Sequence, residues 1–314
     1  MPHKESLEII ELHPTFGAEV RGVDFSRPEA LKAVFPEILA AITKYGVLVL
    51  RKTGLDDDSH IAFSQMFGPL DDVSPYSIKG KKHRLSTELL FDVSNLTADS
   101  EVAPLTSHRW AANKGNENFH VDSSFNSRRA GYSLLRAAQL PPPGTGGATE
   151  FADTRAAFQD LPEQQKEDLI EKDYVGCHSL IHSRKKAVPD FMGDVDPEDY
   201  PMSRHRLVQK HEPSGRWNLY VASHLHHIEG LGREESDKLV EQLYEHAKKP
   251  RYVLRVEWEN EGDLVIWDNT CVMHRATPGD YEGKYARDMR RATVHDTSSQ
   301  ATGLNETEFR AGLP

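Results

Sequence analysis

Hydrophobic residues in the first third of the chain fall in short blocks separated by polar and turn-forming residues. The continuous apolar run Val47–Leu50 is typical of a buried strand, and residues 7–12 predict another strand. A helical stretch is predicted over residues 28–44. A second helix is predicted to begin at an N-cap cluster over residues 57–59 and to end near Met66. This part of the chain therefore alternates strands and helices.

The rest of the chain predicts β-structure with helical insertions. Helices are predicted over residues 162–172 and 233–248, and strands over residues 252–256, 264–267 and 291–294. Residues 73–116 are polar and lack clear periodicity, which is typical of a lid or binding loop within a compact domain. We expect one mainly β domain over residues 1–314: a jelly-roll (double-stranded β-helix) core with helical decoration. The lid-like insertion lies at about 73–116, and a helical and loop insertion at about 153–250.

Charge and composition narrow the class of protein. The 314 residues include 38 Lys and Arg against 49 Asp and Glu, and this net charge of -11 argues against nucleic-acid or anionic-membrane partners. No apolar run is long enough to span a bilayer, residues 1–10 lack the apolar core of a signal peptide, and two cysteines cannot form a disulfide framework. We therefore expect a cytoplasmic protein, which could still hold a small anionic molecule if individual arginines point into a pocket.

The segment His120-Val121-Asp122 carries candidate metal ligands. Residues two apart in a strand project to one face, so His120 and Asp122 could reach a single ion. A second, distant histidine would complete a 2-His-1-carboxylate set, which leaves positions open for a co-substrate and dioxygen and suits Fe(II). Alone, the motif is weak evidence, because about one such match is expected by chance in a chain with 16 histidines. A histidine beside a capping aspartate explains it as well.

Residues 267–294 supply further candidates. An apolar strand and turn lead to His274, and Arg287, Arg290 and Arg291 follow where a final strand is predicted to start. The planar fork of arginine matches a carboxylate through two parallel hydrogen bonds, which lysine cannot copy. This segment could therefore bring a metal ligand and an anion clamp into one cavity.

Six motifs occur in a fixed order along the chain. They are Gly115-Asn116, His120-Val121-Asp122, Gly146-Gly147-Ala148-Thr149, Trp267-Asp268-Asn269, His274, and Arg287 through Arg291-Ala292-Thr293. Their order and gaps resemble the taurine dioxygenase and 2,4-dichlorophenoxyacetate dioxygenase family of Fe(II)- and 2-oxoglutarate-dependent enzymes. N-terminal segments match as well, so the resemblance covers about residues 7–295. One departure is Phe119, where the family commonly has tryptophan.

The resemblance implies roles for individual residues. His120, Asp122 and His274 would bind Fe(II), and Thr149 and Arg287 would hold the far carboxylate of 2-oxoglutarate. Dioxygen would be the second co-substrate, and ascorbate the reductant.

The resemblance also implies a set of substrate contacts. Asn116 would line the site near the iron, and Arg291 would face the anionic group of the substrate. The segments around His211 and His224 are similar to the phenoxyacetate dioxygenase branch of the family. In that branch a histidine at the place of His224 helps to bind the substrate carboxylate, and His211 is a further candidate.

The implied function is a dioxygenase that oxidises a C–H bond of a small carboxylate or sulfonate, by hydroxylation or ether cleavage, with formation of succinate and CO2. One alternative is a biosynthetic oxidase of the same family that desaturates or cyclises an amino acid or secondary metabolite, because substrate positioning decides the outcome. Another is a non-catalytic jelly-roll binding protein, although such a module has no need for all five metal and 2-oxoglutarate residues. Family members often self-associate, so a homo-oligomer is compatible with the resemblance.

Overall fold

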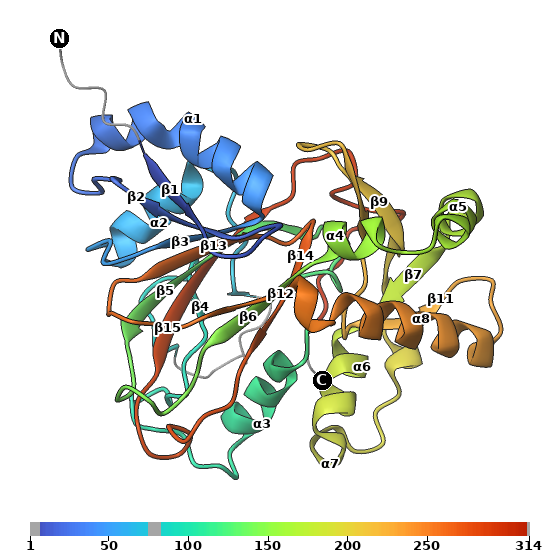
Figure 1. The fold of residues 1–314 in the computed structure, drawn as a ribbon. Helices are drawn as coiled ribbons and strands as arrows, with labels where there is room; N and C mark the ends of the chain where they lie inside the picture. The colour runs from blue at the N-terminus through green and yellow to red at the C-terminus, as the bar shows by residue number, and fades with distance from the viewer. Residues whose placement is uncertain (1–6, 75–82, 313–314) are drawn as a thin grey trace.

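The computed structural model describes residues 7–74 and 83–312, which form a β-rich body and a lobe of helices and short strands (Figure 1). The body contains a seven-stranded sheet with the order β1-β2-β3-β13-β5-β15-β4. Its strands are Glu8–Glu11 (β1), Ala18–Arg21 (β2), Val47–Leu50 (β3), Leu264–Asp268 (β13), Ala130–Gln139 (β5), Asp288–His295 (β15) and Phe91–Asp92 (β4). Neighbouring strands are antiparallel except β2 and β3, which are parallel.

A smaller sheet packs against one face of the large sheet. It has the antiparallel order β12-β6-β14. Its strands are Val253–Val256 (β12), Thr149–Asp153 (β6) and Val272–Ala276 (β14). An isolated bridge between His120 and His274 places a further segment beside β14. Two facing sheets of mainly antiparallel strands form the jelly-roll core that the sequence predicts.

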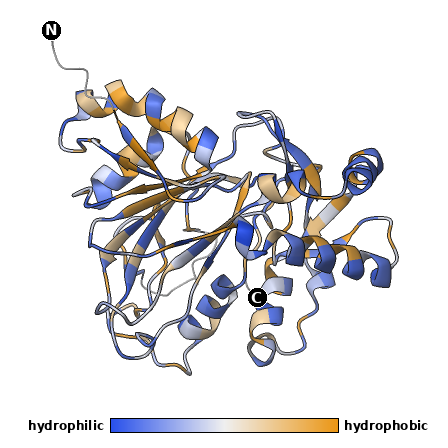
Figure 2. Ribbon diagram, in the orientation of Figure 1, coloured by the Kyte–Doolittle hydropathy of each residue, from blue (hydrophilic) through white to orange (hydrophobic). Residues whose placement is uncertain are grey.

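Strand β3 shows how the apolar residues are divided between two cores. Because successive side chains alternate between the faces of a strand, Val47 and Val49 join the core between the two sheets, with Phe151 of β6. Leu48 and Leu50 join the core on the opposite face of the large sheet. These four strand residues are at most 2% exposed, and burial of each contributes about 1.5–3 kcal/mol. Figure 2 shows the same apolar bands along the strands and the inner sides of the helices.

Two helices, α1 (Pro28–Tyr45) and α2 (Asp57–Gln65), cover the outer face of the large sheet (Figure 1). Helix α1 begins with a proline in its first turn and ends at Gly46, whose φ of 70° is left-handed. The N-cap of α2 is Asp56, whose carboxylate accepts from the Ser59 N–H at 2.8 Å. This is one residue before the predicted cap cluster, because the carboxylate must precede the N–H groups that it caps.

Residues 154–252, between β6 and β12, form the second lobe. It contains a sheet with the order β11-β7-β8 and the hairpin β9-β10, which pack with helices around a separate apolar core. The elements are Thr154–Gln159 (α4), Glu163–Lys172 (α5), Val175–His178 (β7), Leu180–Ala187 (α6), Pro189–Met192 (α7), Pro197–Asp199 (η3), Ser203–Arg206 (β8), Val208–His211 (β9), Arg216–Leu219 (β10), Leu225–Ile228 (β11), Arg233–Ala247 (α8) and Pro250–Tyr252 (η4). Helices α5 and α8 match the predictions, whereas the five short strands were not predicted.

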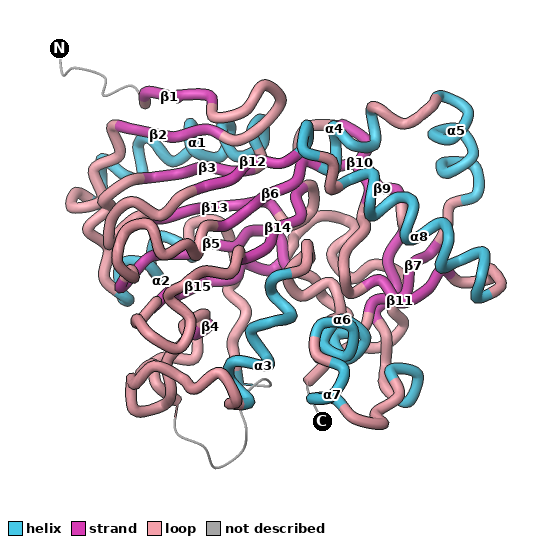
Figure 3. Tube along the Cα trace, turned by 60° about the horizontal axis from the view of Figure 1, so that its bottom comes forward, coloured by secondary structure: helices cyan, strands magenta, loops and turns pink. Residues whose placement is uncertain are grey.

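The described part of the predicted lid-like insertion adds β4 to the edge of the large sheet and then runs between the two lobes. Helix α3 (His108–Lys114) and the 3-10 turn η2 (Gly115–Glu117) run from the edge of the large sheet toward α6, as Figure 3 shows. Residues 75–82 of this insertion lie outside the described residues. Among the described helices, none combines the length and the hydropathy needed to cross a membrane.

Candidate active site

Backbone hydrogen bonds hold His120 and His274 side by side. His274 lies in β14, and the two residues exchange N–H to carbonyl bonds of 2.9 Å in both directions. Asp122 follows in a turn, so the prediction that His120 and Asp122 share a regular strand is wrong. Ser123 in this turn has a φ of 54°, and the Asp122 N–H donates to Asn269 Oδ1 at 3.1 Å. The turn, rather than strand alternation, therefore directs the Asp122 carboxylate toward the two histidines.

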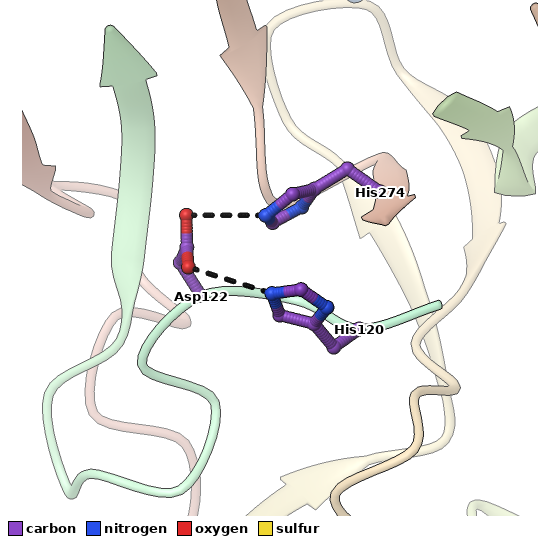
Figure 4. Close-up of side chains that lie close together, drawn as sticks. All are labelled: His120, Asp122 and His274. Atoms are coloured by element: carbon purple, nitrogen blue, oxygen red, sulfur yellow. Dashed lines mark ion pairs between the residues drawn. The ribbon is translucent and has the colours of Figure 1, made fainter. Parts of the chain in front are cut away.

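The three predicted ligands converge at one buried point (Figure 4). One ligand atom from each of His120, Asp122 and His274 lies within 4.8 Å of the other two. The distance from His120 Nε2 to Asp122 Oδ1 is 3.9 Å, and that from His274 Nε2 to Asp122 Oδ2 is 3.5 Å. Each of the three residues is at most 5% exposed. The spacing leaves room for one ion between the three donor atoms.

Hydrogen bonds orient two of these ligands. His120 Nδ1 lies 2.8 Å from the Asn118 carbonyl, which can only accept, so the ring proton lies on Nδ1 and Nε2 keeps its lone pair. Ser133 Oγ donates to Asp122 Oδ2 at 2.8 Å, and Asn269 Nδ2 donates to Ser133 Oγ at 2.9 Å. Asn269 belongs to a motif already noted in the sequence. Ser133 was missed, because it lies in β5, a strand that was not predicted.

The electrostatics favour the ligand forms of all three residues. Burial alone would raise the pKa of Asp122, but Arg291, whose Nη1 donates to Oδ1 at 2.5 Å, and the two histidines lower this pKa to about 2. Burial lowers the pKa of His120 to about 4 and that of His274 well below 6.5. At neutral pH the cluster therefore consists of two neutral imidazoles and one carboxylate. This donor set fits the 2-His-1-carboxylate site of non-haem Fe(II) enzymes.

The buried histidines make the stability of the metal-free protein depend on pH. In the unfolded chain they titrate near 6.5, whereas in the folded protein burial lowers the pKa of His120 and His182 to about 4 and that of His60 and His178 to about 3. Between the folded and the unfolded pKa values, the unfolded chain binds more protons than the folded protein. The contribution of these neutral histidines to the free energy of unfolding is therefore fully present above pH 6.5 and is lost as the pH falls. We expect urea unfolding in the presence of a chelator to give a clearly smaller free energy of unfolding at pH 5 than at pH 7.5. Equal free energies at the two pH values would contradict this expectation.

Thr149 and Arg287 lie at the ends of the strands that flank the cluster. Thr149 begins β6, and its Oγ1 accepts from Trp258 Nε1 at 3.1 Å. Arg287 immediately precedes β15, and its Nη2 donates to the Gly147 carbonyl at 2.9 Å. Arg287 Nε is buried and has no hydrogen-bond partner within the described residues. The guanidinium thus keeps a free donor, as a residue that binds a carboxylate requires.

A pocket opens beside Arg287. It is lined by Asn116 of η2, by Trp110 and Lys114 of α3, and by Tyr281, among other residues. A Cβ on Gly147, whose φ is +86°, would lie 3.0 Å from Arg287 Nε. The glycine therefore leaves space for the guanidinium at the pocket wall.

The other predicted substrate residues divide into two groups. The His224 ring lies 5.7 Å from the His120 ring, and its Nδ1 is 3.1 Å from Ser124 Oγ, so His224 borders the cluster. Arg291 also borders it, but through its hydrogen bond to Asp122. His211 is not brought to the cluster.

His211 belongs to a different buried group. Its Nε2 lies 2.9 Å from Asp268 Oδ2, and its Nδ1 lies 2.6 Å from Ser214 Oγ. His211, Asp268 and Cys271 offer ligand atoms within 4.8 Å of one another, separate from the first cluster. The His211 ring is therefore engaged on both nitrogens, and a role in substrate binding remains a prediction.

Arg184, which lies in α6 of the second lobe, was not singled out as a site residue from the sequence. Its Nη2 donates to Asn116 Oδ1 at 3.1 Å, and its charge acts on both His120 and Asp122. No periodicity or motif pointed to it, because the contact joins segments far apart in the sequence.

Comparison with known proteins places the chain among dioxygenases. Residues 8–293 match the family model described as "Taurine catabolism dioxygenase TauD, TfdA family". An alpha-ketoglutarate-dependent 2,4-dichlorophenoxyacetate dioxygenase of Cupriavidus pinatubonensis is 36% identical, over 91% of this chain and 96% of its own length. An alpha-ketoglutarate-dependent sulfate ester dioxygenase of Pseudomonas putida is 28% identical, over 93% of this chain and 91% of its own. The crystal structure of AAD-2 in complex with Mn(II) and N-oxalylglycine has a TM-score of 0.85 and 36% identity, covering 93% of this chain and 99% of that one.

Proposed function

We propose a function for this chain on the basis that it belongs to the TauD/TfdA family of dioxygenases. The predicted jelly-roll fold and the predicted class of 2-oxoglutarate-dependent enzyme are thereby confirmed, whereas the roles of single residues form part of the proposal. The protein couples oxidative decarboxylation of 2-oxoglutarate to oxidation of a C–H bond in a small anionic substrate. The observation that carries the proposal is the convergence of two neutral imidazoles and one carboxylate at one buried point. Beside them lie arginines, of which some have an N–H with no hydrogen-bond partner within the described residues and one already donates to the carboxylate.

His120, Asp122 and His274 hold a divalent iron ion. When bound, the ion supplies the chemistry that activates dioxygen and oxidises the substrate. Asp122 remains ionised near Arg291, so the site offers the ion one negative charge and two lone pairs. The hydrogen bond that His120 donates to the Asn118 carbonyl and the one that Asp122 accepts from Ser133 fix the ligands before the ion arrives, which limits the reorganisation needed on binding.

Arg287 and Thr149 hold the distal carboxylate of 2-oxoglutarate. The free Nε of Arg287 supports this role, and so does the Thr149 hydroxyl, which can donate while it accepts from Trp258. N-oxalylglycine, the molecule named in the AAD-2 complex, differs from 2-oxoglutarate only by an N–H in place of a methylene. Burial of Arg287 strengthens its attraction for an anion, because the surroundings screen the charge little.

The substrate lies on the side of the cluster bordered by His224, Arg291 and Asn116. An anion held there would place its neighbouring carbon toward the metal, so the oxidised C–H bond is the one beside the anionic group. In an aryloxy acid, hydroxylation of this carbon gives a hemiacetal that collapses to a phenol and an aldehyde. The two similar dioxygenases named for a phenoxyacetate and for sulfate esters support a small carboxylate or sulfate as the substrate.

The test is succinate formation across a panel of anions. The protein is supplied with Fe(II), 2-oxoglutarate, ascorbate and air, together with phenoxyacetate, taurine, octyl sulfate or an amino acid. We expect one class of anion to raise succinate formation above the uncoupled background, with phenol and glyoxylate as products from phenoxyacetate. A product lighter by two hydrogens would instead favour the alternative of a desaturating oxidase. Metal and 2-oxoglutarate binding without succinate for any compound would favour the binding-protein alternative.

A further inference from the structure

Helix α6 turns one of three consecutive basic residues toward the metal-binding cluster. Ser179 caps the start of the helix, and the apolar side chains of Leu180 and Ile181 are buried. Arg184 lies one turn beyond Leu180 and therefore on the same inward face. Lys186, two residues further along, is exposed. The helix thus delivers a single guanidinium from the second lobe to the site.

Arg184 carries a buried donor that the protein leaves unused. The residue as a whole is half-buried, but its Nη1 atom is shut off from solvent. Nη2 donates to Asn116 Oδ1 at 3.1 Å, whereas Nη1 has no hydrogen-bond partner within residues 7–74 and 83–312. Leaving a charged donor buried and unpaired costs free energy, and an acceptor from a bound molecule would remove that cost.

The charges around Arg184 favour an anion as that acceptor. Burial lowers the pKa of Arg184 to about 10, with Asp122 opposing and Arg291 adding to the shift, so the group stays charged at neutral pH. Asp122 already accepts from Arg291 Nη1 at 2.5 Å and faces the metal position. Arg287 lines the pocket to which Asn116 also belongs, and its Nη2 donates to the Gly147 carbonyl at 2.9 Å. One carboxylate therefore cannot neutralise the cations of the site.

We propose that Arg184 binds the anionic group of the substrate through Nη1, with Asn116 orienting its guanidinium. This assignment rests on the proposed function and names its main specificity-determining contact. Arg291, the residue suggested by the sequence, has Nη1 occupied by Asp122 and plays a secondary part. The recognised group is a carboxylate, sulfonate or sulfate, which all present oxygen acceptors to a guanidinium.

Gly115 provides an independent way to disturb Arg184. A Cβ at this position would lie 1.7 Å from Arg184 Nη1 and 2.6 Å from its Cζ, so alanine must displace the guanidinium. The φ of Gly115 is -60°, which alanine adopts without strain. Gly115→Ala should therefore mimic the loss of Arg184 while the arginine itself remains in the chain.

The experiment measures binding to the protein loaded with Mn(II) and 2-oxoglutarate. The variants are Arg184→Met, which keeps the apolar stem, Gly115→Ala, and Lys186→Ala as a control that removes a cation from the same helix. The probes are phenoxyacetate and octyl sulfate, with phenoxyacetamide as a neutral analogue of the first. Calorimetry gives the Kd of each probe, a separate titration of the protein loaded with Mn(II) alone gives the Kd of 2-oxoglutarate, and thermal unfolding reports whether each variant is folded.

We expect the Kd of phenoxyacetate or octyl sulfate to rise about 30-fold or more in Arg184→Met and Gly115→Ala, because a buried charged pair is lost. The Kd of phenoxyacetamide and of 2-oxoglutarate should stay within about threefold, and Lys186→Ala should match the unchanged protein. Such a loss of discrimination between anion and amide is not expected from a merely structural role.

Two results would overturn the assignment, and they differ in what else they affect. Anion affinities that stay unchanged in both folded variants, while the unchanged protein forms succinate, would remove Arg184 from substrate binding and leave the proposed function intact. Failure of every anion of the panel to bind or to stimulate succinate formation in the unchanged protein would contradict the assignment and the proposed function together.

Discussion

Replacing His120 with alanine is expected to abolish tight metal binding and, with it, all 2-oxoglutarate turnover. The variant loses one of three donors at a buried point and leaves Asp122 and His274 as the only protein ligands. Loss of a residue that merely supports a ligand costs about 10–100-fold in metal affinity, so loss of a ligand should cost more than about 100-fold. Titration with Mn(II), followed by calorimetry or by the signal of free Mn(II), measures the change.

The control for this prediction is His246→Ala. His246 is half-buried in α8, and its Nε2 lies 2.8 Å from the Ala157 carbonyl, away from the cluster. This variant should keep the metal affinity of the unchanged protein. Equal affinities in the two histidine variants would show that the cluster of His120, Asp122 and His274 is not the metal site.

Arg287→Ala is expected to raise the Kd of 2-oxoglutarate by about 30-fold to 1000-fold, because truncating one partner of a buried charge pair costs about 2–5 kcal/mol. Metal affinity should change little, because Arg287 does not contact the ligands. Arg290→Ala, in the adjoining strand β15, is the matched control. Its guanidinium pairs with Asp57 and Asp288 and is half-buried. A similar loss in both variants would point to general damage of β15, and no loss in Arg287→Ala would exclude the assigned 2-oxoglutarate position.

Elements with a strong local pattern could be predicted from the sequence. Strands β3 and β13 are short continuous apolar runs because both faces are buried, and their bounds are close to those predicted. Strand β5, the longest strand of the described chain, was missed. Its sequence contains a glycine, a serine and Arg136 among apolar residues, so neither alternation nor a continuous run marks it. Its position is decided by pairing with β13 and β15, which is long-range information.

The residues of the candidate site also fall into those that a sequence motif marks and those that only long-range packing brings together. His120, Asp122 and His274 were predicted because a motif order identifies them even where the local geometry was wrong, as the turn at Asp122 shows. The contact between Arg184 and Asn116 joins residues that are 68 apart in the sequence and depends on how α6 packs against η2. No local pattern encodes that packing. The pairing of Arg291 with Asp122 likewise emerges only when the strands are assembled.

The measurement that tests the central claim most directly is the source of the oxygen in succinate. The protein is incubated with Fe(II), 2-oxoglutarate and its stimulating anion under ¹⁸O₂, with His120→Ala as the control, and succinate is analysed by mass spectrometry. We predict one ¹⁸O atom in each succinate formed by the unchanged protein, in proportion to oxidised product, and no succinate from the variant. Succinate without the label, or equal succinate from the variant, would contradict the assignment of His120, Asp122 and His274 as the centre of a 2-oxoglutarate-dependent dioxygenase.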